Sequence, residues 1–362
     1  MSRVVRVGIV GSGIFGQMHL KAFTQLQSEG KAELLAITDI VKEKREKAAE
    51  EYGVTPYEDY REMIEKENLD AISVVTPDAF HADISTTGLE MGCHVLTEKP
   101  LATTMDDCRK IAETSEKHPD KVIMVDFHKR YDMYHVELER TIREGKLGKI
   151  QYGYAYMEDR IEVSRDWFKN WPAGSSPFWF IGVHFVDLIF WAIKSKGSKV
   201  FATGHREKLK SLGLDFWDNI SAQIVFENGA TFTVDAGWTL PDGFEAIVNQ
   251  GIRVIGTEGI FEIDSQDRGA GGCLKGKTQQ SFNLGFYAEK HTPNGKIVYG
   301  GYGIESIMEF ANHVNYIIGG GNIRDLDGLY ANAFDGMEVS KICVGVHKSA
   351  EAGGEVVDLD TL

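Results

Sequence analysis

The chain of 362 residues is acidic, with a formal net charge of −15, and 43% of its residues are hydrophobic. This length is enough for two domains with separate cores and excludes a small fold held together by disulfides. The negative charge disfavours a nucleic-acid partner, because proteins that bind nucleic acids usually concentrate lysine and arginine on one face. The four cysteines have no metal-binding or disulfide spacing, which favours free thiols in a reducing compartment.

The beginning of the chain and its apolar runs bear on targeting. Residues 1–10 lead directly into an apolar strand pattern and lack the charged, apolar and small-residue order of a signal peptide. No apolar run approaches the roughly 18 residues that a membrane-spanning helix needs. We therefore expect a cytoplasmic protein without a membrane partner.

Short apolar runs alternate with longer helical patterns in the first third of the chain. Such alternation predicts a parallel, doubly wound sheet, whose strands should be almost continuously apolar because helices cover both faces. The predicted strands cover residues 4–10, 33–40, 71–77, 93–100 and 121–127. Segments between them, such as 41–53 and 83–92, have helical patterns that end at glycine.

The pattern changes after residue 126. Residues 219–241 alternate apolar and polar positions on both sides of Asn228-Gly229, a dipeptide typical of antiparallel hairpins. Residues 251–264 predict a second hairpin, and the glycine-rich segment 268–280 lacks periodicity and is interpreted as a flexible loop. Two later helices are predicted over residues 303–318 and 330–351.

The first of these hairpins also bears on assembly. An antiparallel sheet with helices on one face leaves its other face wet or covered by a partner. Phe232, Val234, Ala236 and Trp238 suggest substantial apolar surface on one strand. We expect a homo-oligomer built through this sheet.

A glycine motif follows the first predicted strand and opens a predicted helix. Gly11, Gly13 and Gly16 have the spacing G-x-G-x-x-G, which lets the chain turn tightly and lets a pyrophosphate approach the backbone at a helix N-terminus. With Ile14 and Phe15, these glycines are candidate dinucleotide contacts. A tight strand–helix turn without a nucleotide is the alternative interpretation.

The second predicted strand bears on the kind of nucleotide. It ends near Asp39, about where a carboxylate accepts hydrogen bonds from the adenosine ribose hydroxyls. A carboxylate repels a 2′-phosphate, so the sequence predicts NAD rather than NADP. Lys42, Lys44 and Arg45 follow and are either phosphate ligands or part of a solvated helix face.

Three further motifs stand in the order and spacing of one protein family. They are "VVTPDAFHA" at 74–82, "TEKPLA" at 97–102 and "GVHFVDL" at 182–188. With the glycine motif, they make nearly the whole chain resemble the glucose-fructose oxidoreductase and inositol dehydrogenase family, also called Gfo/Idh/MocA. The resemblance adds candidate cofactor contacts at Thr76, Pro77, His81, Glu98 and Lys99.

The resemblance implies a specific α/β architecture. Residues 1–126 would form an NAD-binding Rossmann domain. Residues 127–362 would form a substrate-binding and oligomerisation α/β domain with an open, mostly antiparallel sheet, in a dimer or tetramer. The activity implied is that of an NAD(P)-dependent oxidoreductase acting on the CH-OH groups of sugars or cyclitols.

Lys99 also has physical support from its position. It precedes Pro100, which favours an extended conformation, and it follows a strand whose carboxyl end is where open α/β sheets bind ligands. A cation there can hydrogen-bond a reacting hydroxyl and stabilise negative charge on its oxygen. An exposed loop lysine is the alternative.

His184 precedes an apolar helical pattern and resembles the family's catalytic histidine. An imidazole that titrates near neutral pH suits the removal of a hydroxyl proton during hydride transfer, and a core histidine is the alternative. The usual D-x-G-x-H pattern is not kept, because Phe180 stands where the aspartate is expected. Asp187 either orients the imidazole or is an acid stabilised by the helix dipole.

Polar and aromatic residues before His184 are typical of surfaces that bind sugars, and equally of contacts between domains or subunits. They are Asp159, Arg160, Arg165, Asp166, Trp167 and Trp171. The candidate substrate contacts are Lys99, His128, Arg160, Asp166, Phe180 and His184, where His128 stands in a position at which the family commonly has asparagine. Lys129 and Arg130 are further candidates. No metal is expected, because no His/Cys ligand spacing is present.

Three functions remain open from the sequence. The first is an NAD-dependent dehydrogenase that oxidises a secondary hydroxyl of a sugar, glycoside or cyclitol, with Lys99 polarising the oxygen and His184 as base. The second is a glycoside-cleaving enzyme that oxidises its substrate transiently and eliminates the leaving group with tightly held NAD. The third is a catalytically silent NAD-binding regulator.

Overall fold

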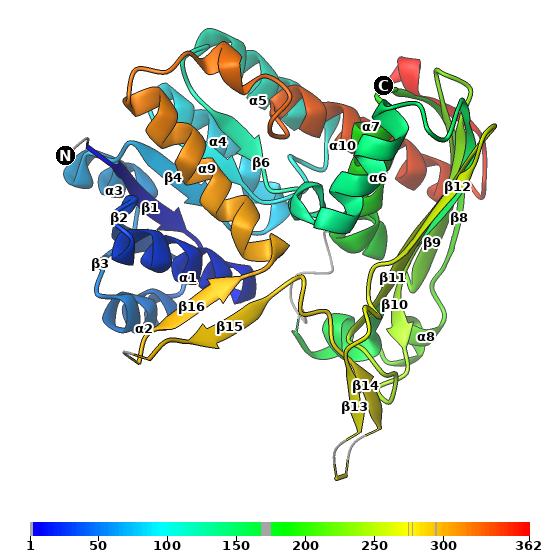
Figure 1. The fold of residues 1–362 in the computed structure, drawn as a ribbon, viewed down its shortest axis with the longest axis horizontal. Coiled ribbons are helices and arrows are strands. Elements are labelled where there is room, and N and C mark those ends of the chain that lie inside the picture. The colour runs from blue at the N-terminus through cyan, green and yellow to red at the C-terminus, as the bar shows by residue number, and fades with distance from the viewer. Residues whose placement is uncertain (1–2, 168–174, 274, 277, 294) are drawn as a thin grey trace. The chain divides into compact units, whose positions relative to one another are not determined.

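The computed structural model describes residues 3–362 apart from 168–174, 274, 277 and 294. The chain divides into two compact units (Figure 1). The first contains Met1–Tyr131 and Gly285–Met337, and the second contains Asp132–Leu284 and Glu338–Leu362. The predicted domain boundary at residue 126 lies near the first break. The prediction of one continuous second domain differs from this division, because residues 285–337 return to the first unit.

The first unit is built on a six-stranded parallel sheet with the order β3-β2-β1-β4-β5-β6, as the Rossmann prediction requires. Its strands are β1 (Val5–Val10), β2 (Ala32–Thr38), β3 (Thr55–Tyr57), β4 (Ala71–Val74), β5 (His94–Thr97) and β6 (Ile123–Val125). Five of them match the predicted strands. The edge strand β3 was missed, because three residues that include Pro56 form no periodic apolar pattern.

Helices cover this sheet, and one of them comes from late in the chain (Figure 1). The early helices are α1 (Ile14–Ser28), α2 (Lys42–Tyr52), α3 (Tyr60–Glu67), α4 (His81–Glu90) and α5 (Met105–Lys117). Helix α9 (Tyr302–Ile318) buries Ile304, Phe310 and Val314 in the same core as Val7 and Ile9 of β1. A hairpin of β15 (Ala288–His291) and β16 (Ile297–Gly300) precedes α9. This packing explains why residues 285–337 belong to the first unit.

The second unit contains a seven-stranded sheet with the order β12-β11-β7-β10-β9-β8-β17. Its strands are β7 (Ile150–Arg160), β8 (Gly197–His205), β9 (Asn219–Phe226), β10 (Thr231–Leu240), β11 (Val248–Gly256), β12 (Ile260–Asp264) and β17 (Val357–Asp358). Neighbours are antiparallel except β7 and β10, which are parallel. Both predicted hairpins, β9–β10 and β11–β12, are confirmed, as is the mostly antiparallel sheet.

The helices of the second unit are α6 (Met133–Arg143), α7 (Val183–Ile193) and α8 (Lys208–Ser211). Helix α10 (Ala333–Glu351) begins in the first unit and continues in the second. The segment predicted as a loop over 268–280 contains two short antiparallel strands, β13 (Gly271–Cys273) and β14 (Gln279–Ser281). The loop prediction was wrong there, because backbone pairing needs no alternation of side chains.

The apolar residues of β10 do not lie on an open face of the sheet. Phe232, Val234, Ala236 and Trp238 are fully or almost fully buried, and Ala236 lies beside the segment Phe178–Gly182 that precedes α7. The expectation that they leave apolar surface for a partner was therefore wrong. Tyr152 and Tyr154 of β7 are exposed instead. In the described part of the chain, no helix has the length and apolar character needed to cross a membrane.

Candidate active site

Two glycines of the motif are required by the geometry of the turn between β1 and α1. Gly11 has a φ of +107°, and a Cβ atom there would lie 2.2 Å from the carbonyl oxygen of Val75. A Cβ atom at Gly16 would lie 2.4 Å from the carbonyl oxygen of Gly11. Real Cβ contacts are longer than this, so both positions require glycine for close backbone approach. The turn is thus packed tightly against β4 and against itself.

Gly13 is different, because the space above it is open. A Cβ atom at Gly13 would meet no described heavy atom within 4 Å. Gly13 is the N-cap of α1, and having no side chain it supplies no capping hydrogen bond to the backbone N–H groups of the first turn. The hydroxyl of Thr76 after β4 is buried and has no hydrogen-bond partner among the described residues. These features fit an anionic group such as a pyrophosphate.

Asp39 follows β2, as predicted, and its carboxylate fixes the glycine turn. One oxygen accepts hydrogen bonds from the backbone N–H of Ser12 at 2.8 Å and from its hydroxyl at 2.7 Å. The other oxygen accepts from the N–H of Val41 at 2.8 Å. Arg45 is buried, pairs with Glu58 and donates to the carbonyl of Asp39 at 3.1 Å. Its guanidinium therefore supports this loop, and the prediction of a solvated face does not hold for Arg45.

His81 begins α4 and joins two loops at the carboxyl end of the sheet. Its ring nitrogens lie 2.8 Å from the carbonyl oxygen of Pro100 and 2.9 Å from that of Thr76. The side chain is fully buried. Its geometry is that of a brace between the Thr76 and Pro100 loops, and its contact with a cofactor stays a prediction.

The E-K-P triplet lies after β5 and is buried. Glu98 is 8% exposed and Lys99 is 6% exposed, so the alternative of an exposed loop lysine was wrong. The N–H of Lys99 donates to Glu98 Oε2 at 3.1 Å. Lys99 Nζ lies 5.9 Å from the centre of the Phe15 ring on the first turn of α1. The triplet is therefore close to the helix that begins at the glycine turn.

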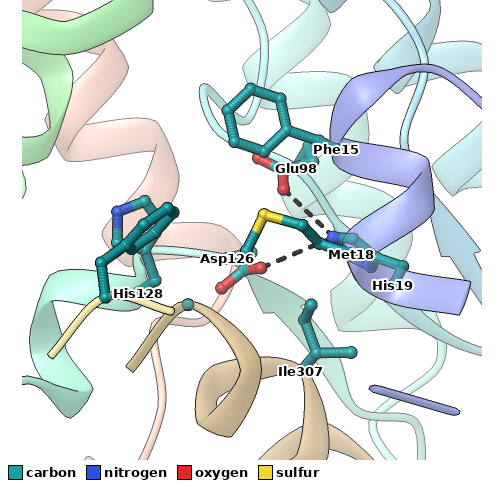
Figure 2. Close-up of a pocket in the computed structure, with 9 residues that line it drawn as sticks. Phe15, Met18, His19, Glu98, Asp126, His128 and Ile307 are labelled. Carbon is teal, nitrogen blue, oxygen red and sulfur yellow. Dashed lines mark hydrogen bonds and ion pairs between the residues drawn. The ribbon is translucent and has the colours of Figure 1, made fainter. Parts of the chain in front are cut away.

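A small pocket in the first unit brings several of these residues together (Figure 2). Its lining consists of Phe15, Met18, His19, Glu98, Asp126, His128, Phe286, Gly303 and Ile307. The predicted residues Phe15, Glu98 and His128 thus share one cavity. The ring of His128 stacks on that of Tyr302 with centres 5.5 Å apart.

Sequence reasoning missed His19 and Asp126. His19 lies three residues after Gly16, on the buried side of α1, and is almost completely buried, and Asp126 is the first residue after β6. The available signal was the position of Asp126 at the carboxyl end of a parallel strand, where such sheets bind ligands. The buried side of α1 that holds His19 follows from helical periodicity.

His19 connects two carboxylates (Figure 2). Its Nδ1 lies 2.7 Å from the hydroxyl of Ser73, and its Nε2 lies 3.1 Å from Glu98 Oε1 and 3.7 Å from Asp126 Oδ2. One potential ligand atom of each of His19, Glu98 and Asp126 lies within 4.8 Å of the other two. This buried set has the chemistry of a metal site and also that of a proton-sharing acid–base cluster. The expectation of no metal rested on sequence spacing, which does not report such a convergence.

The two carboxyl groups differ in their electrostatics. Burial raises the pKa of Asp126 to about 7, and the negative charge of Glu98 adds to this effect. Burial also acts to raise the pKa of Glu98, but the hydrogen bond and charge of His19, with the charge of Lys99, hold that pKa below its ordinary value. Glu98 therefore ionises at a lower pH than Asp126.

Three of the predicted residues of the second unit lie at or beside the start of α7. His184 is 3% exposed in the first turn of this helix, and Asp187 is completely buried one turn later. Phe180 lies in the preceding segment Phe178–Gly182, with its ring centre 6.4 Å from that of Trp238. At the position where the resemblance led us to expect an aspartate, Phe180 therefore packs its ring near another aromatic ring.

The other candidate substrate residues of this unit have local partners. Arg160 pairs with Glu162 at 2.6 Å and donates to the carbonyl of Asp242 at 3.3 Å. Asp166 pairs with Arg165 at 2.6 Å. Trp171 lies outside the described residues. The roles of Arg160 and Asp166 toward a substrate stay predictions.

Comparisons with known proteins agree with this arrangement. A model described as "Oxidoreductase family, NAD-binding Rossmann fold" matches residues 5–127, and a GFO/IDH/MocA C-terminal domain model matches residues 135–262. Inositol 2-dehydrogenase of Rubrobacter xylanophilus is 26% identical over 267 residues, 72% of each chain. D-glucoside 3-dehydrogenase of Escherichia coli is 29% identical over 265 residues, 68% of this chain and 74% of the relative.

A solved structure has the same fold as the whole chain. It is scyllo-inositol dehydrogenase from Lactobacillus casei with bound cofactor NAD(H) and scyllo-inositol, with a TM-score of 0.78 and 21% identity, covering 99% of this chain and 100% of that one. The residues that the two family models match include the glycine turn, the E-K-P triplet and the segment around His184. The chain belongs to the Gfo/Idh/MocA oxidoreductase family.

Proposed function

We propose that the chain is an NAD-dependent dehydrogenase that oxidises a secondary hydroxyl of a polyhydroxylated ring, either a cyclitol or a glycoside. The observation that carries the proposal is the juxtaposition in the first unit of the open glycine turn at Gly13 and the buried E-K-P lysine near α1. A dinucleotide site and a cation suited to a reacting oxygen thus lie on one edge of one sheet. The names of the relatives supply the substrate class.

The residues present fit NAD. The N-terminus of α1 with Gly13 would hold the pyrophosphate, and Asp39 would accept hydrogen bonds from the adenosine ribose hydroxyls. Thr76 offers a buried hydroxyl without a partner among the described residues. When bound, the nicotinamide supplies the acceptor for a hydride. The carboxylate of Asp39 disfavours NADP by repelling a 2′-phosphate.

Two side chains are assigned to the chemistry in this proposal. Lys99 hydrogen-bonds the reacting hydroxyl and stabilises the negative charge that develops on its oxygen. His184 accepts the hydroxyl proton. Phe180 can do neither, so the family's usual aspartate has no counterpart at that position. His128, Arg160 and Asp166 are proposed contacts to the ring hydroxyls.

The proposal is tested by incubating the protein with NAD and a panel of inositols, monosaccharides and glucosides while absorbance at 340 nm is recorded. An increase with an inositol or a glucoside supports it. The second candidate, a glycoside-cleaving enzyme, is favoured if the purified chain releases NAD on denaturation, cleaves a glycoside and accumulates no NADH. If the chain binds NAD but no ring substrate reacts in either way, the regulator interpretation replaces both.

The proposal includes a homo-oligomer, dimer or tetramer, in the cytoplasm. The exposed tyrosines Tyr152 and Tyr154 on β7 support it, because they give the sheet an aromatic outer face. Light scattering across micromolar concentrations tests the assembly, and a mass near 40.3 kDa would contradict it.

A further inference from the structure

We propose that His19, Glu98 and Asp126 form a binding site for one divalent transition-metal ion, and that Zn²⁺ is an ion that its donor atoms suit. The three residues belong to the first unit and come from different elements: His19 from α1, Glu98 from the end of β5 and Asp126 from the end of β6. The site goes beyond the proposed function and does not depend on it, because metal binding is measured without a substrate.

The distances between the donor atoms are the first observation that supports the site. His19 Nε2 lies 3.1 Å from Glu98 Oε1 and 3.7 Å from Asp126 Oδ2, and all three atoms lie within 4.8 Å of one another. Bonds of about 2.0–2.2 Å around a tetrahedral Zn²⁺ place neighbouring donor atoms about 3.3–3.6 Å apart. The two distances from His19 bracket this range, so one ion between the three atoms can bond to each of them.

The orientation of the His19 ring is the second observation. Its Nδ1 lies 2.7 Å from the hydroxyl of Ser73 on β4, and its Nε2 faces the two carboxylates (Figure 2). A histidine that binds a metal through one ring nitrogen typically keeps the other nitrogen in a hydrogen bond, which fixes the direction of the ring. Ser73 is completely buried, so water does not compete for this contact. The ring of His19 is thus held in the direction that a ligand needs.

The third observation is the burial of two carboxylates at one place. Glu98 is 8% exposed and Asp126 is 2% exposed. Buried charges are usually paired or bound to a metal, and one divalent cation compensates two ionised carboxylates at once. Zn²⁺ accepts nitrogen and carboxylate oxygen together, whereas Mg²⁺ and Ca²⁺ bind mainly oxygen. The imidazole of His19 therefore favours Zn²⁺ over these two ions.

The fourth observation is an unused oxygen at the pocket. Asp126 Oδ1 is buried and makes no hydrogen bond to a described residue. Asp126 lines the pocket together with His19 and Glu98 (Figure 2). The pocket gives space beside all three residues, and an ion or a water molecule bound to an ion would use the free capacity of this oxygen. Three protein ligands and one water are the usual set of a zinc site with an open position.

The decisive experiment is a calorimetric titration of Zn²⁺ into the full chain, prepared without an affinity tag and freed of metal with a chelator. We expect one equivalent to bind to the unmodified protein. Asp126→Asn and His19→Gln should each raise the Kd for Zn²⁺ at least about tenfold, because each removes a ligand. Asp83→Asn and His205→Gln are the matched controls, since both side chains are exposed, and they should leave this Kd unchanged. Mg²⁺ in place of Zn²⁺ should not bind at one equivalent.

A second measurement on the unmodified chain covers the case in which the variants do not fold, which their far-UV circular dichroism would show. Co²⁺ with four or five ligands absorbs visible light much more strongly than six-coordinate Co²⁺. We expect the strong spectrum at one equivalent of Co²⁺ and its loss when Zn²⁺ is added. The midpoint of thermal unfolding should also rise with the Zn²⁺ concentration, because the three ligands come together only in the folded chain.

Each of these measurements has a result that overturns the site. The proposal is wrong if the unmodified protein binds no Zn²⁺, or if Asp126→Asn and His19→Gln fold and bind Zn²⁺ as tightly as the two controls. The second result would place the ion at exposed histidines instead. A weak, six-coordinate Co²⁺ spectrum would overturn the site even if both variants failed to fold.

Discussion

Two single-atom changes in the glycine motif separate binding from folding. Gly13→Ala places a methyl group in open space, and Gly13 has φ −65° and ψ −166°, which alanine adopts without strain. Alanine is a poorer N-cap than glycine, which destabilises the helix. It also lowers the conformational entropy of the unfolded chain, which stabilises the folded protein by about 0.4–1 kcal/mol. These effects oppose each other, so we expect the free energy of unfolding to change by less than about 1 kcal/mol.

Gly16→Ala is the matched comparison. Its methyl group would lie 2.4 Å from the carbonyl oxygen of Gly11, and this neighbour is backbone that cannot rotate away. Overpacking of this kind costs about 1–3 kcal/mol. Urea unfolding followed by tryptophan fluorescence should therefore show a lower midpoint for Gly16→Ala and a nearly unchanged midpoint for Gly13→Ala.

The binding of NAD should follow the opposite order in the folded proteins. A methyl group at Gly13 occupies the approach of a pyrophosphate to the N-terminus of α1, and a loss of about 1.4 kcal/mol or more corresponds to at least a tenfold rise in the Kd. Isothermal titration calorimetry measures this directly. An unchanged Kd in Gly13→Ala would refute the assignment of this open space to the cofactor.

The remaining predictions concern the cofactor preference, the chemistry and the pH dependence of stability. Asp39→Asn keeps an acceptor for Ser12 and removes the negative charge, so the ratio of the Kd values for NADP and NAD should fall at least about tenfold by calorimetry. Lys99→Ala and His184→Ala should each lower the single-turnover rate of hydride transfer, recorded at 340 nm, about 100-fold or more. The affinity for NAD should stay nearly unchanged. If His184→Ala transferred hydride at the unmodified rate, His184 would be excluded as the base. Burial lowers the pKa of His94 from 6.5 to about 4, so the folded protein favours the neutral imidazole. The free energy of unfolding therefore contains a contribution from His94 that is present above pH 6.5 and is lost as pH falls toward 4. At pH 5 the loss is about 2 kcal/mol. Urea titrations at pH 7 and 5 should show a smaller loss in His94→Gln, and an equal loss would contradict the assignment.

Local patterns in the sequence were sufficient for most strands and for the glycine turn. Apolar runs mark the buried parallel strands, and Gly11 and Gly16 report close backbone contacts that leave no room for a side chain. The sequence could not show which sheet α9 covers. The pattern of an amphipathic helix shows that the helix has an apolar face, and it does not show which sheet that face packs against. Residues 285–337 were therefore assigned to the second domain, although α9 packs on β1 and α1.

The pocket was harder to predict for the same reason. His19, Glu98 and Asp126 come from three segments separated by 79 and 28 positions, and only the parallel order of the sheet brings them together. The prediction that Phe232 and Trp238 leave apolar surface for a partner was wrong for a different reason. Alternation along β10 shows that one face of the strand is apolar, and it does not show what covers that face. The structure places the segment Phe178–Gly182 against that face.

Each residue of the E-K-P triplet has a separate physical role in this chain. Glu98 accepts from His19, and it compensates the cation of a lysine that is only 6% exposed and would otherwise be costly to bury. Pro100 offers its carbonyl oxygen to His81, which in turn holds the loop of Thr76. Lys99 is thus positioned by neighbours on both sides. A substitution of Glu98 should therefore change the charge around Lys99, and a substitution of His81 should change the backbone around it. Either change should alter the reactivity of Lys99 without abolishing that reactivity, although neither residue needs to touch a substrate.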